Sequence, residues 1–108
     1  MKKNLLYVAS LTLVMVLVNF SSCKKTSSNY TPSCSGATKT YSADAAPVFQ
    51  SACAGCHSGK YDNYSGVSAD KSDIRSKVLD GSMPQNSTLT DAQKNAIICW
   101  IDAGALNN

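Results

Sequence analysis

Apolar and polar residues divide this chain into three stretches. Residues 5–18 form an almost uninterrupted apolar run, residues 24–40 are polar and rich in Ser and Thr, and residues 41–108 place apolar side chains at helical spacings. No run alternates apolar and polar positions as a half-buried β-strand does. The pattern therefore predicts one small all-α domain of about three helices over residues 41–108.

The first predicted helix covers residues 43–53 and ends at a pair of cysteines. Ser42 or Asp44 can serve as its N-cap, because their side-chain oxygens accept hydrogen bonds from free backbone N–H groups. Pro47 then falls in the first turn, where a helix tolerates a residue that has no N–H.

The second predicted helix begins at Ser68 or Ser72 and continues to residue 79. Ile74 and Val78 are four residues apart, so they share one face of that helix. Gly81 follows as the predicted stop, because glycine adopts the left-handed conformation that commonly ends a helix.

The last predicted helix follows a loop over residues 81–88, where Gly, Pro and Asn cluster. Thr90 and Gln93 have the spacing of a capping box, and Asp91 suits the positive end of the helix dipole. Gly104 is the predicted end of this helix. Its apolar positions follow at helical spacing: Ile97, Trp100 and Ile101.

The N-terminal stretch predicts export and lipid attachment. A basic start precedes the apolar run, which is shorter than the roughly 20 residues of a spanning helix. Residues 21–23, Ser-Ser-Cys, resemble the lipobox of bacterial lipoproteins, in which the cysteine is lipidated and becomes the new N-terminus. The resemblance predicts a signal peptide over residues 1–22, a lipid on Cys23 and a flexible tether over residues 23–40. We therefore expect an exported protein, anchored to a bacterial membrane and facing the periplasm.

The charge of the chain does not favour a nucleic-acid partner. The formal net charge is +3, and removal of the two lysines of the predicted signal lowers it to +1. A nearly neutral domain lacks the electrostatic footprint of a nucleic-acid-binding protein. The chain also contains no glutamate and no constellation of acid, base and nucleophile, so we expect that it is not an enzyme.

The densest cluster of reactive side chains is Cys53-Ala54-Gly55-Cys56-His57. Three kinds of site use such a cluster: a disulfide oxidoreductase, a zinc site, and a covalently bound haem, which takes two sulfurs for its vinyl groups and one nitrogen for its iron. His57 is the only histidine of the chain, which excludes a zinc site with two histidines. A thioredoxin-like site needs a βαβ context, and no strand is predicted.

One methionine remains after the predicted signal is removed. Met83 lies in the sequence Gly-Ser-Met-Pro, on the loop between the last two predicted helices. A thioether beside Pro84, on a stiffened loop, suits an iron ligand better than a filler of the core.

Together these features resemble the small class I c-type cytochromes over residues 41–106. The resemblance implies that Cys53 and Cys56 form thioether bonds to haem, and that His57 and Met83 bind the iron on its two faces. The family often uses a proline carbonyl to accept the N–H of the proximal imidazole, and no proline lies between His57 and Met83 here.

The resemblance extends to the helices that pack together in that family. Phe49 and Ala45 occupy the aromatic and small positions through which the first helix crosses the last. Trp100 fits the aromatic position of the last helix. The end of the chain, CWIDAGALNN, closely resembles the ends of small lipoprotein cytochromes.

The resemblance implies a lipid-anchored monohaem cytochrome c that carries electrons between redox partner proteins of a respiratory or periplasmic chain. Its cofactor would be one covalent haem c. Two other functions stay open: a haem-based sensor or ligand binder with a labile Met83, and a structural zinc lipoprotein.

Two cysteines have no role in these assignments. Cys34 and Cys99 are left once Cys23, Cys53 and Cys56 are assigned, and export to an oxidising compartment favours a disulfide between them. The bridge would connect the segment before the first helix to the last helix.

Overall fold

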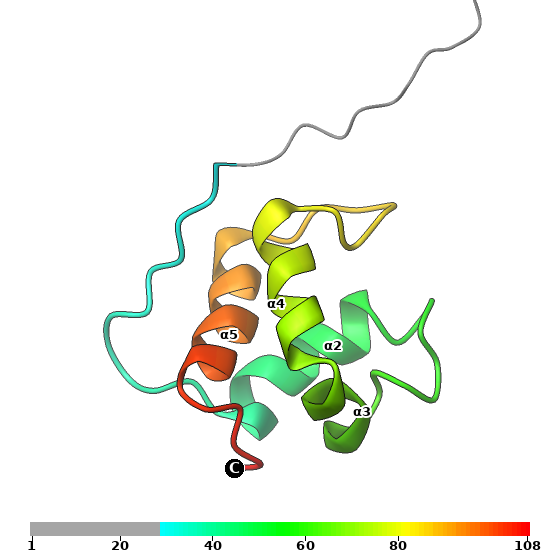
Figure 1. Ribbon diagram of the computed structural model, residues 1–108, viewed down its shortest axis with the longest axis horizontal. Coiled ribbons are helices and arrows are strands. Elements are labelled where there is room, and N and C mark those ends of the chain that lie inside the picture. The colour runs from blue at the N-terminus through cyan, green and yellow to red at the C-terminus, as the bar shows by residue number, and fades with distance from the viewer. Residues whose placement is uncertain (1–28) are drawn as a thin grey trace, which may run out of the picture.

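The computed structural model describes residues 29–108. The predicted signal peptide, Cys23 and the start of the predicted tether lie outside the described residues. The described part contains no β-strand, which confirms the all-α prediction (Figure 1). Its elements are a π-helical turn, η1 (Tyr41–Ala45), followed by four α-helices: α2 (Ala46–Ala52), α3 (Tyr64–Ala69), α4 (Lys71–Asp80) and α5 (Asp91–Asp102).

The first helical segment begins before the residues that the sequence predicted as caps. Thr40 is the N-cap, because its side chain accepts a hydrogen bond from the N–H of Ala43 at 3.3 Å. Asp44 does not cap the helix; its carboxylate instead accepts a hydrogen bond from the N–H of the cap residue Thr40 at 2.8 Å. The prediction of Ser42 or Asp44 as N-cap was therefore wrong, while Pro47 does lie at the start of α2 as predicted.

Helix α3 was absent from the sequence prediction. It is only six residues long, and Asn63 caps it by accepting the N–H of Gly66 at 3.0 Å. Asp70 is both the C-cap of α3 and the N-cap of α4. The two helices therefore follow one another with a single residue between them.

Helix α4 confirms the second predicted helix and fixes its start at Lys71, next to Ser72 rather than Ser68. Ile74 and Val78 are both buried, so the predicted shared face does point into the core. Gly81 ends the helix in the left-handed conformation with φ of 74°. Only glycine adopts that conformation without steric cost, which explains the stop.

Helix α5 agrees most closely with its prediction. The reciprocal capping box between Thr90 and Gln93 is present at its start. At its centre the Trp100 indole is 1% exposed and donates Nε1–H to the carbonyl of Leu106 at 2.8 Å. This bond folds the residues after Gly104 back over the helix end.

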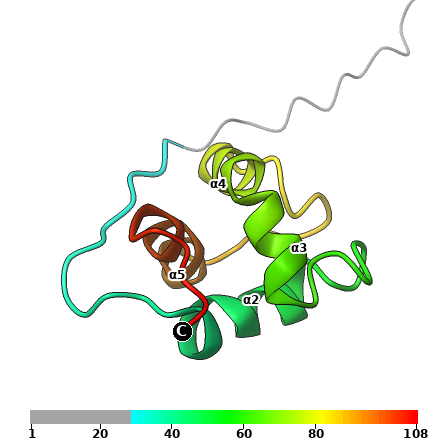
Figure 2. The same ribbon diagram turned by 60° about the horizontal axis from the view of Figure 1, so that its bottom comes forward.

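Aromatic rings surround Trp100 and hold η1, α2 and α3 against α5. Its ring centroid lies 5.4 Å from Tyr41, 6.1 Å from Phe49 and 6.3 Å from Tyr64. Ala45 is fully buried where η1 packs on α5, as the expected crossing of the first and last helical segments requires. Figure 2 shows η1 and α2 passing beneath α5.

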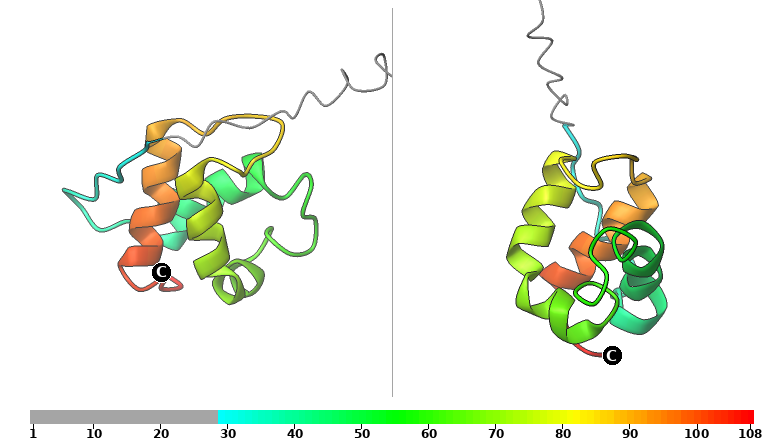
Figure 3. Two further views of the ribbon diagram at one scale, coloured as in Figure 1. Left: turned by 45° about the horizontal axis from the view of Figure 1, so that its top comes forward. Right: turned by 90° about the vertical axis from the view of Figure 1, so that its right-hand side faces the viewer.

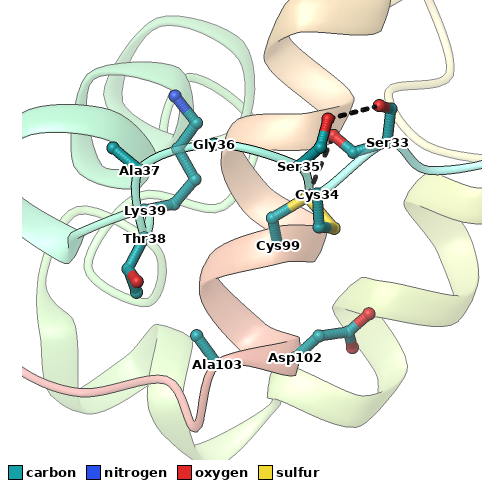
Figure 4. Close-up of a pocket in the computed structure, with 10 residues that line it drawn as sticks. All are labelled: Ser33, Cys34, Ser35, Gly36, Ala37, Thr38, Lys39, Cys99, Asp102 and Ala103. Atoms are coloured by element: carbon teal, nitrogen blue, oxygen red, sulfur yellow. Dashed lines mark hydrogen bonds between the residues drawn. A yellow bond between two sulfur atoms is a disulfide. The ribbon is translucent and has the colours of Figure 1, made fainter.

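Residues 29–40 run along the outer side of α5 without forming a helix (Figure 1). The Tyr30 hydroxyl donates to the Asn95 side chain, and a disulfide joins Cys34 to Cys99 as predicted (Figure 4). Part of the predicted tether is thus attached to α5. Within residues 29–108, no helix has the length and apolar character needed to cross a bilayer.

Candidate functional site

The Cys53–His57 segment folds into tight turns directly after α2. The N–H of Cys53 bonds to the carbonyl of Phe49 at 3.0 Å and so closes the helix. The carbonyl of Cys53 then accepts the N–H groups of Cys56 at 3.2 Å and His57 at 2.9 Å. Because these turns are short and hydrogen-bonded, they bring both thiols and the imidazole to one side of the chain.

These three side chains line one cavity together with Met83. The cavity has a volume of about 320 Å³, which falls within the range of small-molecule and cofactor sites. All four residues that the sequence predicted as haem-binding therefore meet in one place, although His57 and Met83 are on separate loops. Helix α2, helix α4 and the loop before α5 form its walls.

The inner wall of the cavity is apolar. Phe49 is 1% exposed, Val78 is 4% exposed and Ile74 is 6% exposed, and all three line the cavity. The polar side chains of α4 and of the loop before α5 that line the cavity are exposed. They are Asp73, Lys77, Gln85, Asn86 and Ser87. A planar apolar group with polar edges would match this division.

Met83 is positioned by the end of α4. The left-handed turn at Gly81 redirects the chain, and the N–H of Met83 then bonds to the carbonyl of Lys77 at 3.3 Å. The Met83-Pro84 peptide bond is cis. Figure 3 shows this loop extending from α4 over the end of α2, from which Cys53 emerges.

The two thiols of the cluster are free, and Cys53 is half-buried while Cys56 is exposed. Burial, and secondarily the nearby Cys56 thiol, raise the pKa of Cys53. A nucleophilic redox cysteine has a lowered pKa instead, so this environment does not favour a disulfide oxidoreductase. Cys34 and Cys99 are bonded to each other, which leaves neither thiolate for a zinc ion.

The structure adds one neighbour of His57 that the sequence analysis missed. The Tyr61 ring packs against the imidazole, with ring centroids 4.8 Å apart and planes tilted by 42°. The Tyr61 N–H bonds to the His57 carbonyl at 3.1 Å, as in a helical turn. The spacing of four residues was the signal in the sequence that could have revealed this contact.

Asp70 is the acidic side chain that both Tyr61 and Lys60 contact. Its carboxylate accepts the Tyr61 hydroxyl at 2.8 Å and forms an ion pair with Lys60 at 2.5 Å. The hydrogen bond from Lys60, followed by that from Tyr61, lowers the pKa of Asp70. Burial, followed by the bond to Asp70, raises the pKa of Tyr61.

The side chains that face the cavity include the donor groups that a covalent haem requires. Two free thiols, one imidazole and one thioether face a cavity with an apolar inner wall, and these are the groups that a covalent haem with two axial ligands uses. The residues therefore fit the group. Within residues 29–108, no group of three or more His, Cys or acidic side chains is arranged so that it could hold a metal ion by itself.

Comparisons with known proteins do not identify the chain. No protein-family model, curated protein or solved structure matches it.

Proposed function

We propose that this protein is a lipid-anchored monohaem cytochrome c that transfers electrons. The observation that carries the proposal is the single cavity lined by Cys53, Cys56, His57 and Met83. The spacing of the first three residues supports covalent haem, and the convergence of Met83 on them supports a second axial ligand. Cys23 would hold the domain at the membrane, and a periplasmic redox protein would be its partner.

Each of these residues has a distinct task in the proposed function. Cys53 and Cys56 would add their S–H groups across the two vinyl groups and so prevent loss of the cofactor. His57 and Met83 would be the two protein ligands of the iron, which leaves no open position for a substrate. The bound haem supplies one-electron chemistry through the ferric and ferrous states of its iron.

The apolar wall has a task of its own. Phe49, Ile74 and Val78 are buried and exclude water from the inner side of the cavity. Exclusion of water disfavours the more highly charged ferric state, and a thioether ligand acts in the same direction. The wall and Met83 would therefore both raise the reduction potential.

An absorption spectrum of the exported protein tests the proposal directly. A sharp Soret band with a distinct α-band after reduction is expected for six-coordinate haem c. Replacement of both Cys53 and Cys56 by alanine should abolish haem staining on denaturing gels. Haem staining that persists in this double variant would contradict covalent attachment at these residues, and a parent protein without visible absorption would refute the function.

Met83→Ala tests the second axial ligand. The variant should keep its covalent haem but open one iron position, so the ferrous form should bind carbon monoxide readily while the parent resists it. Its reduction potential should also fall. Gln85→Ala is the matched control, because Gln85 lines the same cavity from the same loop but offers no sulfur. If parent and Met83→Ala bind carbon monoxide equally well, the haem-based sensor becomes the better proposal.

A further inference from the structure

The loop after His57 is fixed to α3 and α4 by contacts that involve one tyrosine. Tyr61 lines the cavity beside His57, and its ring contacts the imidazole at 4.8 Å between centroids. Its hydroxyl points away to Asp70, to which it donates at 2.8 Å. Tyr61 thus connects the imidazole to the junction of α3 and α4.

Besides the bond from Tyr61, two further contacts hold Asp70 in place. Its carboxylate forms the ion pair with Lys60, and its backbone carbonyl accepts the N–H of Ile74 as α4 begins. The Lys60 carbonyl packs so closely on α3 that a Cβ built on Gly66 would lie 1.7 Å from it. The loop, Tyr61 and Asp70 therefore form one fixed unit next to His57.

An imidazole that binds iron can still rotate about its bond to the chain and about its bond to the metal. Proteins restrict this rotation through groups that contact the ligand from behind. No proline lies between His57 and Met83 to supply the carbonyl that c-type cytochromes often use. A tilted aromatic contact restricts ring rotation by a different means, because turning the imidazole would lose the packing with Tyr61.

We propose that Tyr61, held by Asp70, is a positioning residue that sets the plane of the His57 imidazole. The inference rests on the proposed function, in which His57 binds haem iron. Tyr61 does not bind the iron, and its effect passes through the ring of His57. Loss of its ring should change the orientation of the imidazole, whereas loss of its hydroxyl alone should only loosen that orientation.

The experiment uses the full exported holoprotein and its ferric proton NMR spectrum. The shifts of the haem methyl groups report the plane of the axial ligand, which a purely structural contact would leave unchanged. Tyr61→Leu should shift these resonances and alter their spread. Tyr61→Phe keeps the ring but loses its hydrogen bond to Asp70, so its resonances should show a measurable displacement that is smaller than that of Tyr61→Leu.

Tyr64→Phe is the matched control. The Tyr64 hydroxyl also donates to a fixed acceptor, the carbonyl of Ala105 at 2.9 Å, but its ring packs on Tyr41 and Trp100 and not on His57. This variant should unfold at a lower temperature with unchanged methyl shifts. Comparison of the Tyr61 and Tyr64 variants therefore distinguishes a loss of stability from a change in the orientation of the His57 imidazole.

The outcomes are distinguishable. Unchanged methyl shifts in both Tyr61 variants, with a normal six-coordinate spectrum, would overturn the role of Tyr61 and leave the proposed function intact. If Tyr61→Leu does not fold, Tyr61→Phe decides: a displacement absent from Tyr64→Phe supports the role, and identical spectra refute it. A parent protein without covalent haem would refute the proposed function, and this inference with it.

Discussion

Gly66→Ala is a small change at a position where the structure leaves no space. Gly66 lies in α3, and its N–H is bonded to the Asn63 side chain at 3.0 Å. A Cβ at this position would lie 1.7 Å from the Lys60 carbonyl oxygen and 2.8 Å from the Lys60 carbonyl carbon. The obstacle is backbone, so no change of side-chain rotamer can relieve the clash.

Two opposing effects determine how much Gly66→Ala changes the free energy of unfolding. Alanine is more favourable than glycine inside a helix by roughly 1 kcal/mol. Close carbon-to-oxygen contacts rarely fall below about 3.3 Å, so either α3 or the Lys60 peptide must move by roughly 1.6 Å. Overpacking of this kind costs about 1–3 kcal/mol or more, and the rigid obstacle favours the upper end. We expect a net loss of about 1–2 kcal/mol in the free energy of unfolding.

The assay is thermal unfolding of the holoprotein, followed by far-ultraviolet circular dichroism. For a domain of this size the expected loss lowers Tm by about 4–16 °C. Gly55→Ala is the matched control, because a Cβ at Gly55 would meet no atom within 4 Å. Its Tm should stay close to that of the parent. A Gly66→Ala protein as stable as the parent, or more stable, would refute the reasoning, because helix propensity would then outweigh the contact with Lys60.

Three further predictions concern the anchor, the disulfide and a surface ion pair. Cys23→Ser should abolish incorporation of labelled lipid, and normal incorporation in the variant would contradict the anchor. Thiol titration of the unfolded, unreduced holoprotein should find neither Cys34 nor Cys99 reactive, and replacement of both by serine should cost up to about 4 kcal/mol because the bridge closes a 65-residue separation. Arg75 binds Asp102 through two hydrogen bonds of 2.6 and 2.9 Å and lowers the pKa of that carboxyl. A lowered pKa stabilises the fold above the ordinary value of 3.8 and loses that effect as the pH falls further, so Asp102→Asn should cost about 0.2–1 kcal/mol in urea unfolding at pH 7 and nothing in strong acid.

Features that depend on neighbouring residues were predictable from the sequence. The capping box of Thr90 and Gln93 marks the start of α5, and Gly81 marks the end of α4. Their signals work because a cap satisfies backbone groups within one turn of itself. The grouping of Cys53, Cys56 and His57 was visible for the same reason, since five consecutive residues stay together in any fold.

Short elements with weak local signals were not predictable. Helix α3 has six residues and one buried apolar side chain, Val67, so it shows no apolar periodicity. The choice of Thr40 over Ser42 as N-cap also left no trace in the pattern, because both residue types cap helices and serine is on average the more favourable of the two. Packing of Tyr41 and Ala45 against α5 decides where the first helical segment begins.

The sequence by itself determined the all-α class, the positions of α4 and α5 and the chemical identity of the donor groups. Only the tertiary structure brought Met83 to the cavity that His57 lines and placed Tyr61 and Asp70 behind that imidazole. The physical reason is the range of the forces involved. Caps and helical periodicity act within a few residues, whereas the convergence of two loops depends on how α2, α4 and α5 bury their apolar faces together.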